Sequence, residues 1–542
     1  MSDKIDDKFE KVKSAEELSR DQREISVSEF FEKNRHLLGY DNKVKALLTV
    51  VREAVDNSLD ATEEARIIPD IKVSVKPVND VKDRYVISVE DNGPGIVKQN
   101  VGRVFGKLLF GSKFHKLRQS RGQQGIGISG AVLYAQLTSG KPAKIVTSTG
   151  DGKTHYMDLM IDTFKNEPEI LKEEIKEGKI WHGVKVELEV EGKYVEHQQS
   201  IQEYLKQTAI SNPYAEIIYD SPNGKIKFER SVKTLPEAPK SIKPHPHGVE
   251  IGILRRMLKT TEARKLVGFF TTDFSRVGQS SAKEIIRLAK FSDEVSPKNI
   301  DGPQVEKLFQ AIQQVHLMKP PLDCLSPLRE KLIEEGLNKQ LKPEYVVSIT
   351  RSPDVYRGNP FEIEVGLAYG GELPKDSVAT LYRFANRVPL MYQAGDCALA
   401  KAVSEIEWRR YGLEQASSAA LPTGPIAIFV HIVSVWVPFT SESKEAIASY
   451  PEIIKEVKLA LQEAGRKLSI YVNKKRRAGE VAMRISLFEK YIPEVSDALA
   501  RLSGADKRGI ATKLENMLKK GKIVIEDTRE PEEGVKQKED DE

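Results

Sequence analysis

Cysteine is nearly absent from this sequence, which has two cysteines, Cys324 and Cys397, among 542 residues. Two distant thiols cannot build a disulfide framework or a four-thiolate zinc cluster, and their scarcity fits the reducing cytoplasm. Long apolar runs are absent as well, because no stretch approaches the roughly 18 residues that a membrane-spanning helix needs. The charged first 40 residues lack the apolar core of a signal peptide. We therefore expect a cytoplasmic protein with no membrane partner.

A strong excess of one charge is also missing. The 84 lysines and arginines nearly balance the 80 aspartates and glutamates, which leaves a net charge of +4. This charge is too small to indicate nucleic acid binding by itself, so any DNA contact must come from local patches. With 39% hydrophobic and 30% charged residues the composition is that of a globular protein, and the length predicts roughly two to four domains.

The clearest pattern in the chain is an amphipathic helix over residues 44–65, whose apolar residues recur at helical spacing. Beside this apolar stripe, Glu53, Asn57 and Asp60 follow at i, i+4 and i+7 and share one face. The Glu53 carboxylate can accept a proton from an attacking water, and the Asn57 amide oxygen can bind a hard cation such as Mg²⁺. The alternative is an ordinary solvated face on a core helix.

Two glycine-rich segments follow this helix. A strand over residues 85–89 runs into Asp91, Asn92, Gly93, Pro94 and Gly95, where glycines let the backbone approach a ligand and the acid can accept from an exocyclic amine. Residues 122–127 then carry Gly-x-x-Gly-x-Gly and lead into an apolar helix, so backbone N–H groups and the positive helix end face an anion. Each segment alone is also a common turn or loop.

In this order, the segments resemble the Bergerat ATP-binding fold shared by gyrase-type topoisomerases, MutL mismatch-repair proteins, the ninety-kilodalton heat-shock chaperones and histidine kinases. The resemblance implies ATP and Mg²⁺ as cofactors, with Glu53 as the general base and Asn57 as the metal ligand. It also implies that Asp91 holds the adenine amine and that Gly93 and Gly95 shape the adenine pocket. The residues expected around the phosphates are Ser112, Lys113, Gly122, Gln123, Gln124, Gly125, Ile126, Gly127, Ile128 and Ser129.

The chain departs from this family at one position. The family usually places Thr after His-Gly, where the hydroxyl helps to hold a water beside the adenine, but this chain has His182, Gly183 and Val184. Val184 cannot supply that hydroxyl, whereas Asp91 can bind adenine without it.

Beyond the ATP-binding segments, prolines in residues 243–248 predict a linker, and residues 249–322 turn helical. His245 and His247 are spaced for a metal, but no third ligand is near. The helical part resembles the helix–two-turns–helix domain of DNA-repair glycosylases, of a small-subunit ribosomal protein and of type IIB topoisomerase B subunits. Lys283 and Arg287 form only a thin basic patch there, so DNA contact and a generic helical insertion both stay open.

An α/β pattern returns at residue 323, and residues 436–445 are expected to open a long helix that persists to about Tyr471. By the resemblance, Lys444 reaches into the ATP site and touches the γ-phosphate. The basic cluster of residues 474–477 is expected to end the helix, and it either complements the helix dipole or contacts DNA phosphates. Residues 408–411 interleave Trp, Arg and Tyr, as a nucleic-acid contact or a core Trp would. Residues 488–502 predict another amphipathic helix.

The order of these parts resembles the B subunits of type IIB DNA topoisomerases, the topoisomerase VI family. We therefore expect an α+β multidomain chain with these parts: a flexible N-terminal arm (1–24), a Bergerat-fold ATPase α/β sandwich (25–244), a helix–two-turns–helix insert (245–322), a transducer α/β domain with a long C-terminal helix (323–485), and a partner-binding helix with a disordered acidic tail (486–542).

The resemblance implies an ATP-hydrolysing subunit whose nucleotide-driven dimerisation captures duplex DNA. Cleavage and passage of the DNA would belong to an A subunit in an A₂B₂ heterotetramer, because this chain shows no cleaving tyrosine with its metal ligands. The alternative is a nucleotide-switched clamp, or a chaperone-like module of the same superfamily, without topoisomerase activity. The Glu53 base distinguishes the two, because a pure switch does not need it.

Overall fold

The computed structural model describes residues 15–19, 24–113, 116–122, 125–178, 181–441 and 443–527. The chain divides into two compact units, Met1–Gly465 and Arg466–Glu542. The larger unit holds two large sheets, with a helical block between them in the sequence, and a small two-stranded sheet. Among the described residues, no helix combines the length and the apolar character that crossing a bilayer requires.

The first sheet has eight strands in the order β5-β4-β3-β6-β2-β1-β7-β8. Its neighbours are antiparallel except β1 and β7, which are parallel. The strands are β1 (Asp70–Pro77), β2 (Arg84–Asp91), β3 (Ala143–Thr149), β4 (Lys153–Asp162), β5 (Glu167–Glu177), β6 (His182–Glu191), β7 (Glu216–Ser221) and β8 (Gly224–Phe228).

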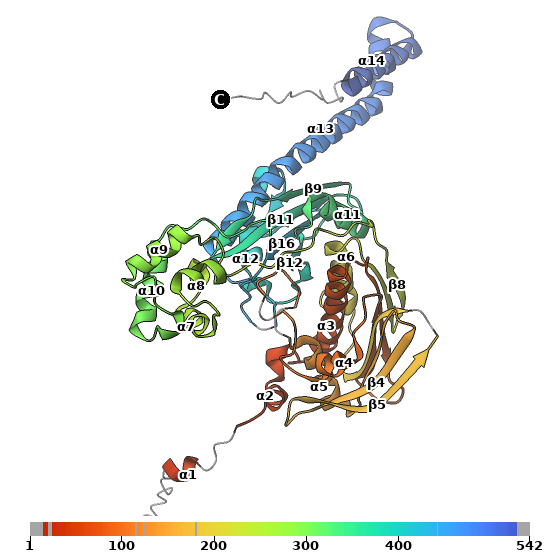
Figure 1. The fold of residues 1–542 in the computed structure, drawn as a ribbon. Coiled ribbons are helices and arrows are strands. Elements are labelled where there is room, and N and C mark those ends of the chain that lie inside the picture. Colours follow the sequence, from red (N-terminus) through yellow and green to blue (C-terminus); the bar gives the residue numbers. More distant parts are fainter. Residues whose placement is uncertain are drawn as a thin grey trace, which may run out of the picture. The chain divides into compact units, whose positions relative to one another are not determined.

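Helices cover one face of this sheet (Figure 1). They are α3 (Lys43–Glu64), α4 (Lys98–Gly106), α5 (Gly127–Ser139) and α6 (Ile201–Ser211). Alternate side chains of β1, namely Ile71, Val73 and Val75, are buried against them in one apolar core. The helix predicted over residues 44–65 is confirmed as α3, which Asn42 caps by accepting from the Lys45 N–H at 2.8 Å.

The N-terminal arm predicted for residues 1–24 lies mostly outside the described residues, and α1 (Ala15–Ser19) is the part that is seen. Helix α2 (Val27–Lys33) follows, and the Ser26 hydroxyl caps it by accepting from the Glu29 N–H at 3.0 Å. A 3₁₀ turn, η1 (Arg35–Leu38), leads from there to α3.

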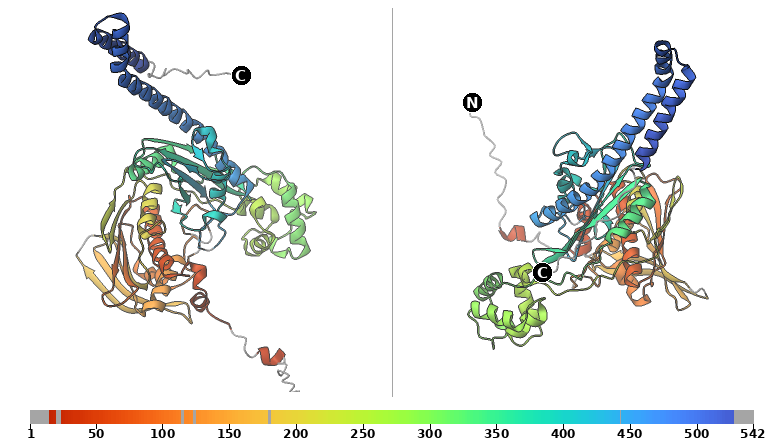
Figure 2. Two further views of the ribbon diagram at one scale, coloured as in Figure 1. Left: turned by 180° about the vertical axis from the view of Figure 1, so that it is seen from behind. Right: turned by 90° about the horizontal axis from the view of Figure 1, so that it is seen from above.

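The helical block predicted for residues 249–322 is present and has a core of its own (Figure 2). Its helices are α7 (Ile251–Thr260), α8 (Leu266–Asp273), α9 (Gln279–Leu288) and α10 (Pro303–Gln314), with 3₁₀ turns η2 (Pro246–Gly248) and η3 (Pro297–Asn299). Phe269, Phe270 and Phe274 pack ring against ring, with centroids 5.2–5.7 Å apart.

The second sheet has the order β10-β11-β16-β12-β13, and β9 also pairs with β11. Its strands are β9 (Tyr345–Thr350), β10 (Asp354–Tyr356), β11 (Asn359–Tyr369), β12 (Thr380–Ala385), β13 (Val388–Pro389) and β16 (Ile426–Ser434). A small pair, β14 (Glu414–Gln415) and β15 (Pro422–Thr423), lies outside it. The accompanying helices and turns are α11 (Arg329–Leu341), η4 (Ala394–Asp396), α12 (Ala398–Ser404) and η5 (Trp408–Tyr411).

The two sheets share buried apolar contacts. Ile210 of α6 and Tyr214, which follows this helix, belong to one core cluster with Leu337 of α11 and with Phe384 and Phe429 of the second sheet. The contact is close, because a Cβ on Gly336 would lie 2.1 Å from the Ile210 carbonyl oxygen. The first sheet and the second sheet therefore pack as one body within the larger unit.

The long helix differs from its prediction at both ends. Helix α13 (Pro451–Ser503) begins at a proline, the residue that favours the first helical turn, and residues 443–450 before it are irregular. Residues 474–477 lie inside α13, so the prediction that they end it at a dipole is wrong. Residues 488–502 continue α13 rather than form another helix, because no helix-breaking pair separates them from the first part.

The smaller unit contains most of α13 and also α14 (Lys507–Asp527), which the sequence analysis did not identify. Asp497 of α13 accepts from Lys507 and pairs with Arg501, at 2.8 and 2.7 Å. The disordered acidic tail was predicted for residues 527–542. Asp527 is the last residue of α14, and residues 528–542 lie outside the described residues.

Candidate active site

A cavity of about 520 Å³ lies between α3, the end of β2, the start of α5 and a loop of the second sheet. The polar face of α3 therefore lines a cavity rather than an open surface. The predicted site residues that line it are Glu53, Asn57, Asp91, Gly95, Ser112, Lys113, Gly122, Gly125, Ile126, Gly127, Ile128 and Lys444, together with Asp60. Gln123 and Gln124 lie outside the described residues.

Asp91, at the end of β2, has its carboxylate held by three donors. Oδ2 accepts from the Ser58 hydroxyl at 2.7 Å, and Oδ1 accepts from the N–H groups of Gly93 and Val184 at 2.9 and 3.1 Å. Burial raises the pKa of this carboxyl, although the three hydrogen bonds oppose the shift. Asp91 is thus a fixed acceptor in the wall of an otherwise largely apolar part of the cavity.

The turn after β2 requires glycine at residue 95. Gly95 has a φ of +74°, and a Cβ there would lie 2.0 Å from the Ser148 carbonyl oxygen. Gly93 is held differently, because its carbonyl oxygen lies 2.8 Å from His182 Nδ1. These contacts bring the ends of β2, β3 and β6 together at one end of the cavity.

Val184, where the family usually has Thr, contacts Asp91 through its backbone. Its side chain lines the cavity, and its β3 partner in the sheet register is Thr147. The buried Thr147 hydroxyl oxygen accepts from the Ile96 N–H at 2.9 Å. The hydroxyl group absent at residue 184 is therefore not needed to hold Asp91 in place.

Glu53 lies where α3 meets the first residue of α5. Arg52 Nη2 lies 3.2 Å from Glu53 Oε1, and a Cβ on Gly127 would lie 1.9 Å from Glu53 Oε2. One turn along, Asp56 accepts from the Tyr204 hydroxyl at 2.9 Å. Burial and the neighbouring Glu53 charge raise the pKa of Asp56 to about 6. Arg52 and Glu53 thus line this corner of the cavity, and Asp56 lies behind them on α3.

Asn57 presents an exposed side chain to the cavity. A Cβ on Gly122 would lie 3.9 Å from Asn57 Oδ1, so the amide faces the glycine loop (residues 122–127). Ser129, by contrast, is buried, and its hydroxyl donates to the Ile126 carbonyl oxygen at 3.0 Å within α5. The structure thus brings Asn57 to the cavity but turns the Ser129 side chain to its own helix.

Asp60 is buried and paired with two cations from the loop that follows α4. Lys113 Nζ pairs with Oδ2, and Arg121 Nη1 lies 2.9 Å from Oδ1. Burial alone would raise the pKa of Asp60, but Lys113 and Arg121 outweigh it and hold the pKa well below its ordinary value. The Gly122 N–H also points to this carboxylate, at 3.4 Å.

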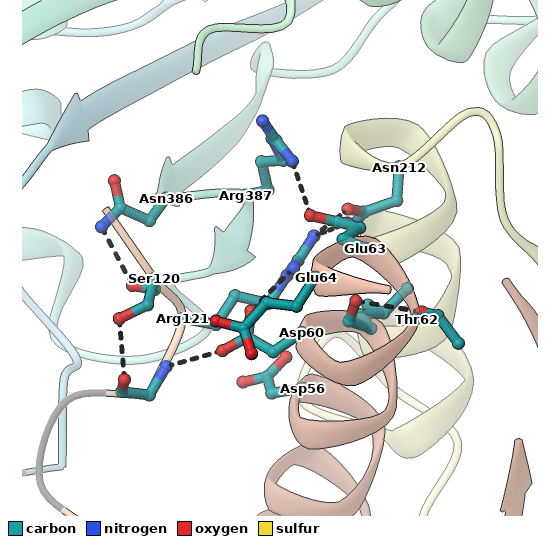
Figure 3. A network of polar contacts seen from close by, with 12 residues as sticks. Asp56, Asp60, Thr62, Glu63, Glu64, Ser120, Arg121, Asn212, Asn386 and Arg387 are labelled. Carbon is teal, nitrogen blue, oxygen red and sulfur yellow. Dashed lines mark hydrogen bonds and ion pairs between the residues drawn. The ribbon is translucent and has the colours of Figure 1, made fainter. Parts of the chain in front are cut away.

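Arg121 extends this network to Glu63, one turn further along α3 (Figure 3). Arg121 Nη2 lies 2.5 Å from Glu63 Oε1, and Arg387 from the second sheet lies 2.8 Å from Glu63 Oε2. The two arginines outweigh the effect of burial and hold the pKa of Glu63 below its ordinary value. The Tyr214 hydroxyl donates to the same carboxylate at 2.6 Å.

Lys444 reaches the cavity from the loop before α13. Its Nζ donates to the Arg121 carbonyl oxygen at 3.2 Å, and its backbone is left-handed with a φ of +55°. The neighbouring residues hold this loop to α3, since Glu445 pairs with Lys45 at 2.5 Å and the Ser443 carbonyl oxygen accepts from Arg52 at 3.4 Å. Lys444 therefore reaches the cavity from an irregular loop. The prediction that it lies just before a helix is wrong, because α13 begins only at Pro451.

Comparison with known proteins places this geometry in a family. The description "Histidine kinase-, DNA gyrase B-, and HSP90-like ATPase" matches residues 42–163, and "Topoisomerase VI B subunit, transducer" matches residues 320–484. The B subunit of type 2 DNA topoisomerase 6 from Archaeoglobus fulgidus is 49% identical over 488 residues, which are 90% of this chain and 80% of that protein. The chain belongs to this family of B subunits.

Two further topoisomerase 6 B subunits are similar to this chain. That of Methanococcoides burtonii is 49% identical over 90% of this chain and 78% of its own length, and that of Pyrococcus furiosus is 40% identical over 92% and 94%. The predicted fold class is confirmed, with an ATPase sandwich, a helical insert and a transducer that has a long helix. The chain is a subunit of an ATP-dependent type II DNA topoisomerase, and the clamp without that activity is not favoured.

In this topoisomerase chain the Trp408 side chain belongs to the core. It is fully buried, and its Nε1 donates to the Val403 carbonyl oxygen at 3.0 Å. The Arg409 guanidinium is used locally, because its Nε donates to the Gln415 carbonyl oxygen at 2.9 Å. The alternative that Trp408 stacks on nucleic acid is therefore wrong. Arg409 and Arg410 are the exposed residues of the four.

The two histidines of the linker both serve the fold. His245 Nε2 lies 3.0 Å from the Met318 carbonyl oxygen, and His247 Nε2 lies 3.1 Å from the Ile312 carbonyl oxygen. Within the described part of the chain, no three His, Cys, Asp or Glu side chains are grouped as a metal site. Lys283 and Arg287 are exposed on one face of α9, as a DNA contact would require, and this contact stays a prediction.

The sequence analysis missed Arg121, Asn386 and Arg387. Arg121 immediately precedes the glycine loop, so its position beside a phosphate-binding motif was a usable signal. Asn386 and Arg387 lie in the second sheet, more than 250 residues along the chain from Arg121, and no motif connects them to the site. Their roles are visible only once the two sheets are packed together.

Proposed function

We propose that this protein binds ATP with Mg²⁺ in the cavity and hydrolyses it. One observation supports this above all: the Glu53, Asn57 and Asp91 side chains from the first sheet and its helices and the Lys444 amine from the transducer line the same cavity. Such convergence of a carboxylate base, a hard-cation ligand, an amine acceptor and a long flexible cation suits nucleotide hydrolysis.

At one end of the cavity, Asp91 binds the adenine amine, and Gly93 and Gly95 let the backbone approach the ring. The apolar side chains of Val89, Ile96 and Val184, which line the same cavity, suit the flat faces of a purine. At the other end, the phosphates lie against Ser112, Lys113 and the glycine loop. The N–H groups at the start of α5 point to an anion there.

The residues present fit Mg²⁺. Asn57 offers its amide oxygen to the cavity, and Mg²⁺ in nucleotide sites is held by one or two protein oxygens together with phosphates and waters rather than by a dedicated protein cage. When bound, Mg²⁺ neutralises charge on the phosphates. Asp60 is not available as a ligand, because Lys113 and Arg121 occupy its carboxylate oxygens.

Glu53 is the general base that accepts the proton of the attacking water. Arg52 orients its carboxylate at 3.2 Å, and Gly127 leaves room for it against α5. Lys444 contacts the γ-phosphate from the transducer side, so that loss of this phosphate changes the contact between the two sheets.

The family also supports wider proposals. An A subunit joins two copies of this chain in an A₂B₂ heterotetramer in the cytoplasm, and nucleotide-dependent pairing of the two copies captures duplex DNA. The domains run as 1–24 (arm), 25–244 (ATPase), 245–322 (helix–two-turns–helix, with DNA contact through α9), 323–485 (transducer) and 486–542 (partner-binding helix and tail).

Replacing the base tests the proposal. Glu53→Gln should bind a non-hydrolysable ATP analogue as the wild type does, while hydrolysis falls roughly 10²- to 10⁴-fold, which is the usual contribution of a general base. Glu90→Gln is the matched control, because Glu90 lies on β2 and pairs with the exposed Lys72 at 2.8 Å. Turnover of Glu53→Gln near that of the control would remove Glu53 from the mechanism.

A further inference from the structure

The hairpin of β12 and β13 in the transducer ends in a strained two-residue turn. Its residues, Asn386 and Arg387, have φ values of +47° and +69°. Two consecutive positive φ values make the kind of turn that joins hairpin strands, and asparagine tolerates this conformation whereas arginine rarely adopts it. A left-handed arginine persists only where its surroundings hold it, so the contacts of Arg387 are informative.

Both side chains of this turn are buried, and they reach Ser120 and, on α3, Glu63 (Figure 3). Asn386 Nδ2 donates to the Ser120 carbonyl oxygen at 3.1 Å. Arg387 Nη1 donates to Glu63 Oε2 at 2.8 Å, and Nη2 donates to the Ser326 carbonyl oxygen at 2.6 Å. The turn thus contacts both α3 and the segment that leads to the glycine loop.

Three consecutive residues of that segment are held by the transducer. The Gln119 amide exchanges two hydrogen bonds with the Ser326 backbone, at 2.7 and 3.0 Å. The Ser120 carbonyl oxygen accepts from Asn386, and the Arg121 carbonyl oxygen accepts from Lys444 at 3.2 Å. The next residue is Gly122, so the position of the glycine loop depends on where the transducer places residues 119–121.

We propose that Asn386 and Arg387 are positioning residues for ATP hydrolysis, which hold residues 119–121 and Glu63 so that Lys444 and the glycine loop meet the nucleotide phosphates together. This inference depends on the proposed function of the cavity. The link to the site is short, because Arg121 binds Glu63 with one nitrogen and Asp60 with the other, and Lys113 shares Asp60. A shift of the transducer sheet against α3 must break the Arg387 and Asn386 contacts and displace the loop.

These contacts are not needed to hold the two sheets together. The apolar cluster around Tyr214, Leu337 and Phe384 already joins them. Without Arg387, Glu63 keeps Arg121 and the Tyr214 hydroxyl, so the buried carboxylate stays paired. Variants of Arg387 should therefore fold, and their effects should appear in catalysis. The Asn386 amide also exchanges two hydrogen bonds with the Ser434 backbone, at 2.9 Å each, so Asn386→Gly should lower the melting temperature as well.

The test uses the full-length chain and three variants of the turn. Arg387→Met keeps the length of the side chain and removes the guanidinium, Arg387→Lys restores a cation, and Asn386→Gly keeps the positive φ while removing the amide. We expect kcat for ATP hydrolysis to fall roughly tenfold or more in Arg387→Met and Asn386→Gly, because small misplacements of catalytic groups are costly. The dissociation constant of a non-hydrolysable ATP analogue should change less than about threefold, and Arg387→Lys should recover part of kcat.

Arg357→Met is the matched control. Arg357 also has a positive φ, of +44°, at the exposed turn before β11 of the same sheet, where it stacks on Tyr450 at 5.0 Å and not on the site. We expect its kcat to lie within about twofold of the wild type, because its contacts are remote from the cavity. The melting temperatures of all variants show whether an effect comes from the fold.

A kcat of Arg387→Met or Asn386→Gly equal to the control, or a loss of kcat matched by an equal loss of nucleotide affinity, would overturn the proposal. Glu53→Gln, measured alongside, separates this failure from that of the proposed function. If Glu53→Gln is inactive while the turn variants are fully active, the positioning role alone is wrong. If Glu53→Gln hydrolyses ATP normally, the assignment of the site itself fails.

Discussion

Adding one methyl group at Gly127 should move the proposed base. The Cβ of Gly127→Ala would lie 1.9 Å from Glu53 Oε2, and ordinary contact begins near 3.4 Å, so the carboxylate must retreat by about 1.5 Å. It has room to do so, because Glu53 borders the cavity, but it then leaves Arg52. A misplacement of about 1 Å typically costs 10²-fold, so hydrolysis should fall roughly 10²-fold, which corresponds to about 2.7 kcal/mol on the barrier.

The assay compares kcat, the affinity for ADP and the melting temperature. Gly127→Ala should keep its melting temperature, because the group that yields is a flexible side-chain end and alanine is the better helix former. Gly252→Ala on α7 is the control, since a Cβ there would meet nothing within 4 Å. Hydrolysis by Gly127→Ala within about threefold of this control would refute the placement of Glu53 as the base.

Three further predictions concern other parts of the chain. Lys444→Met should lower the affinity for an ATP analogue and the hydrolysis rate more than the affinity for ADP, because the contact is to the γ-phosphate; equal losses in titrations with both nucleotides would contradict it. Trp408→Phe should lower the free energy of unfolding by about 2 kcal/mol, because it leaves a cavity in the core and removes the indole hydrogen bond to the Val403 carbonyl oxygen, yet leave DNA affinity unchanged in a binding assay. Burial raises the pKa of Glu362 to about 7 although Arg329 opposes the shift, so the folded protein favours the protonated carboxyl. The contribution of this carboxyl to the free energy of unfolding is therefore fully present below about pH 4.5 and is lost as the pH rises through about 7. Denaturant unfolding should therefore show Glu362→Gln close to the wild type at pH 5 and more stable by about 2 kcal/mol at pH 8, and an equal difference at both pH values would refute this.

Local patterns predicted the nucleotide side of the site. Three parts were predicted in this way: helix α3, the turn after β2 and the glycine loop. Each combines a periodic element with a motif of fewer than ten residues, so its geometry is set by residues that are neighbours in the sequence. Strand β11 is buried at every position from Pro360 to Ala368, including the two glutamates Glu362 and Glu364, so its burial does not follow from polarity alone.

Elements with weak or conflicting patterns were missed. Strand β5 is almost entirely exposed and rich in Glu and Lys, so its sequence does not show the alternation of a half-buried strand. The start of α13 was placed too early, although Pro451 marked it, because apolar residues of the preceding loop mimic helical spacing. The continuation of α13 through residues 474–477 was missed because a basic cluster was taken for a helix end.

Apart from Lys444, the contacts made by the transducer could not be predicted. Asn386, Arg387 and Ser326 meet Ser120, Glu63 and Gln119 across 200 or more residues of sequence, and their partners depend on how α6 and α11 pack. An asparagine and an arginine between two strands predict a turn, but nothing in the sequence says which surface that turn will touch.

The order in which the chain is synthesised gives these distant contacts a consequence for the cell. A ribosome completes the first sheet at Phe228, but Ser326, Asn386 and Lys444, which hold residues 119–121, arrive later, the last of them about 200 residues on. At 5–20 residues per second this interval lasts roughly 10–40 s. During it, residues 119–121 lack their partners from the transducer, so the proposed positioning of the glycine loop cannot yet operate.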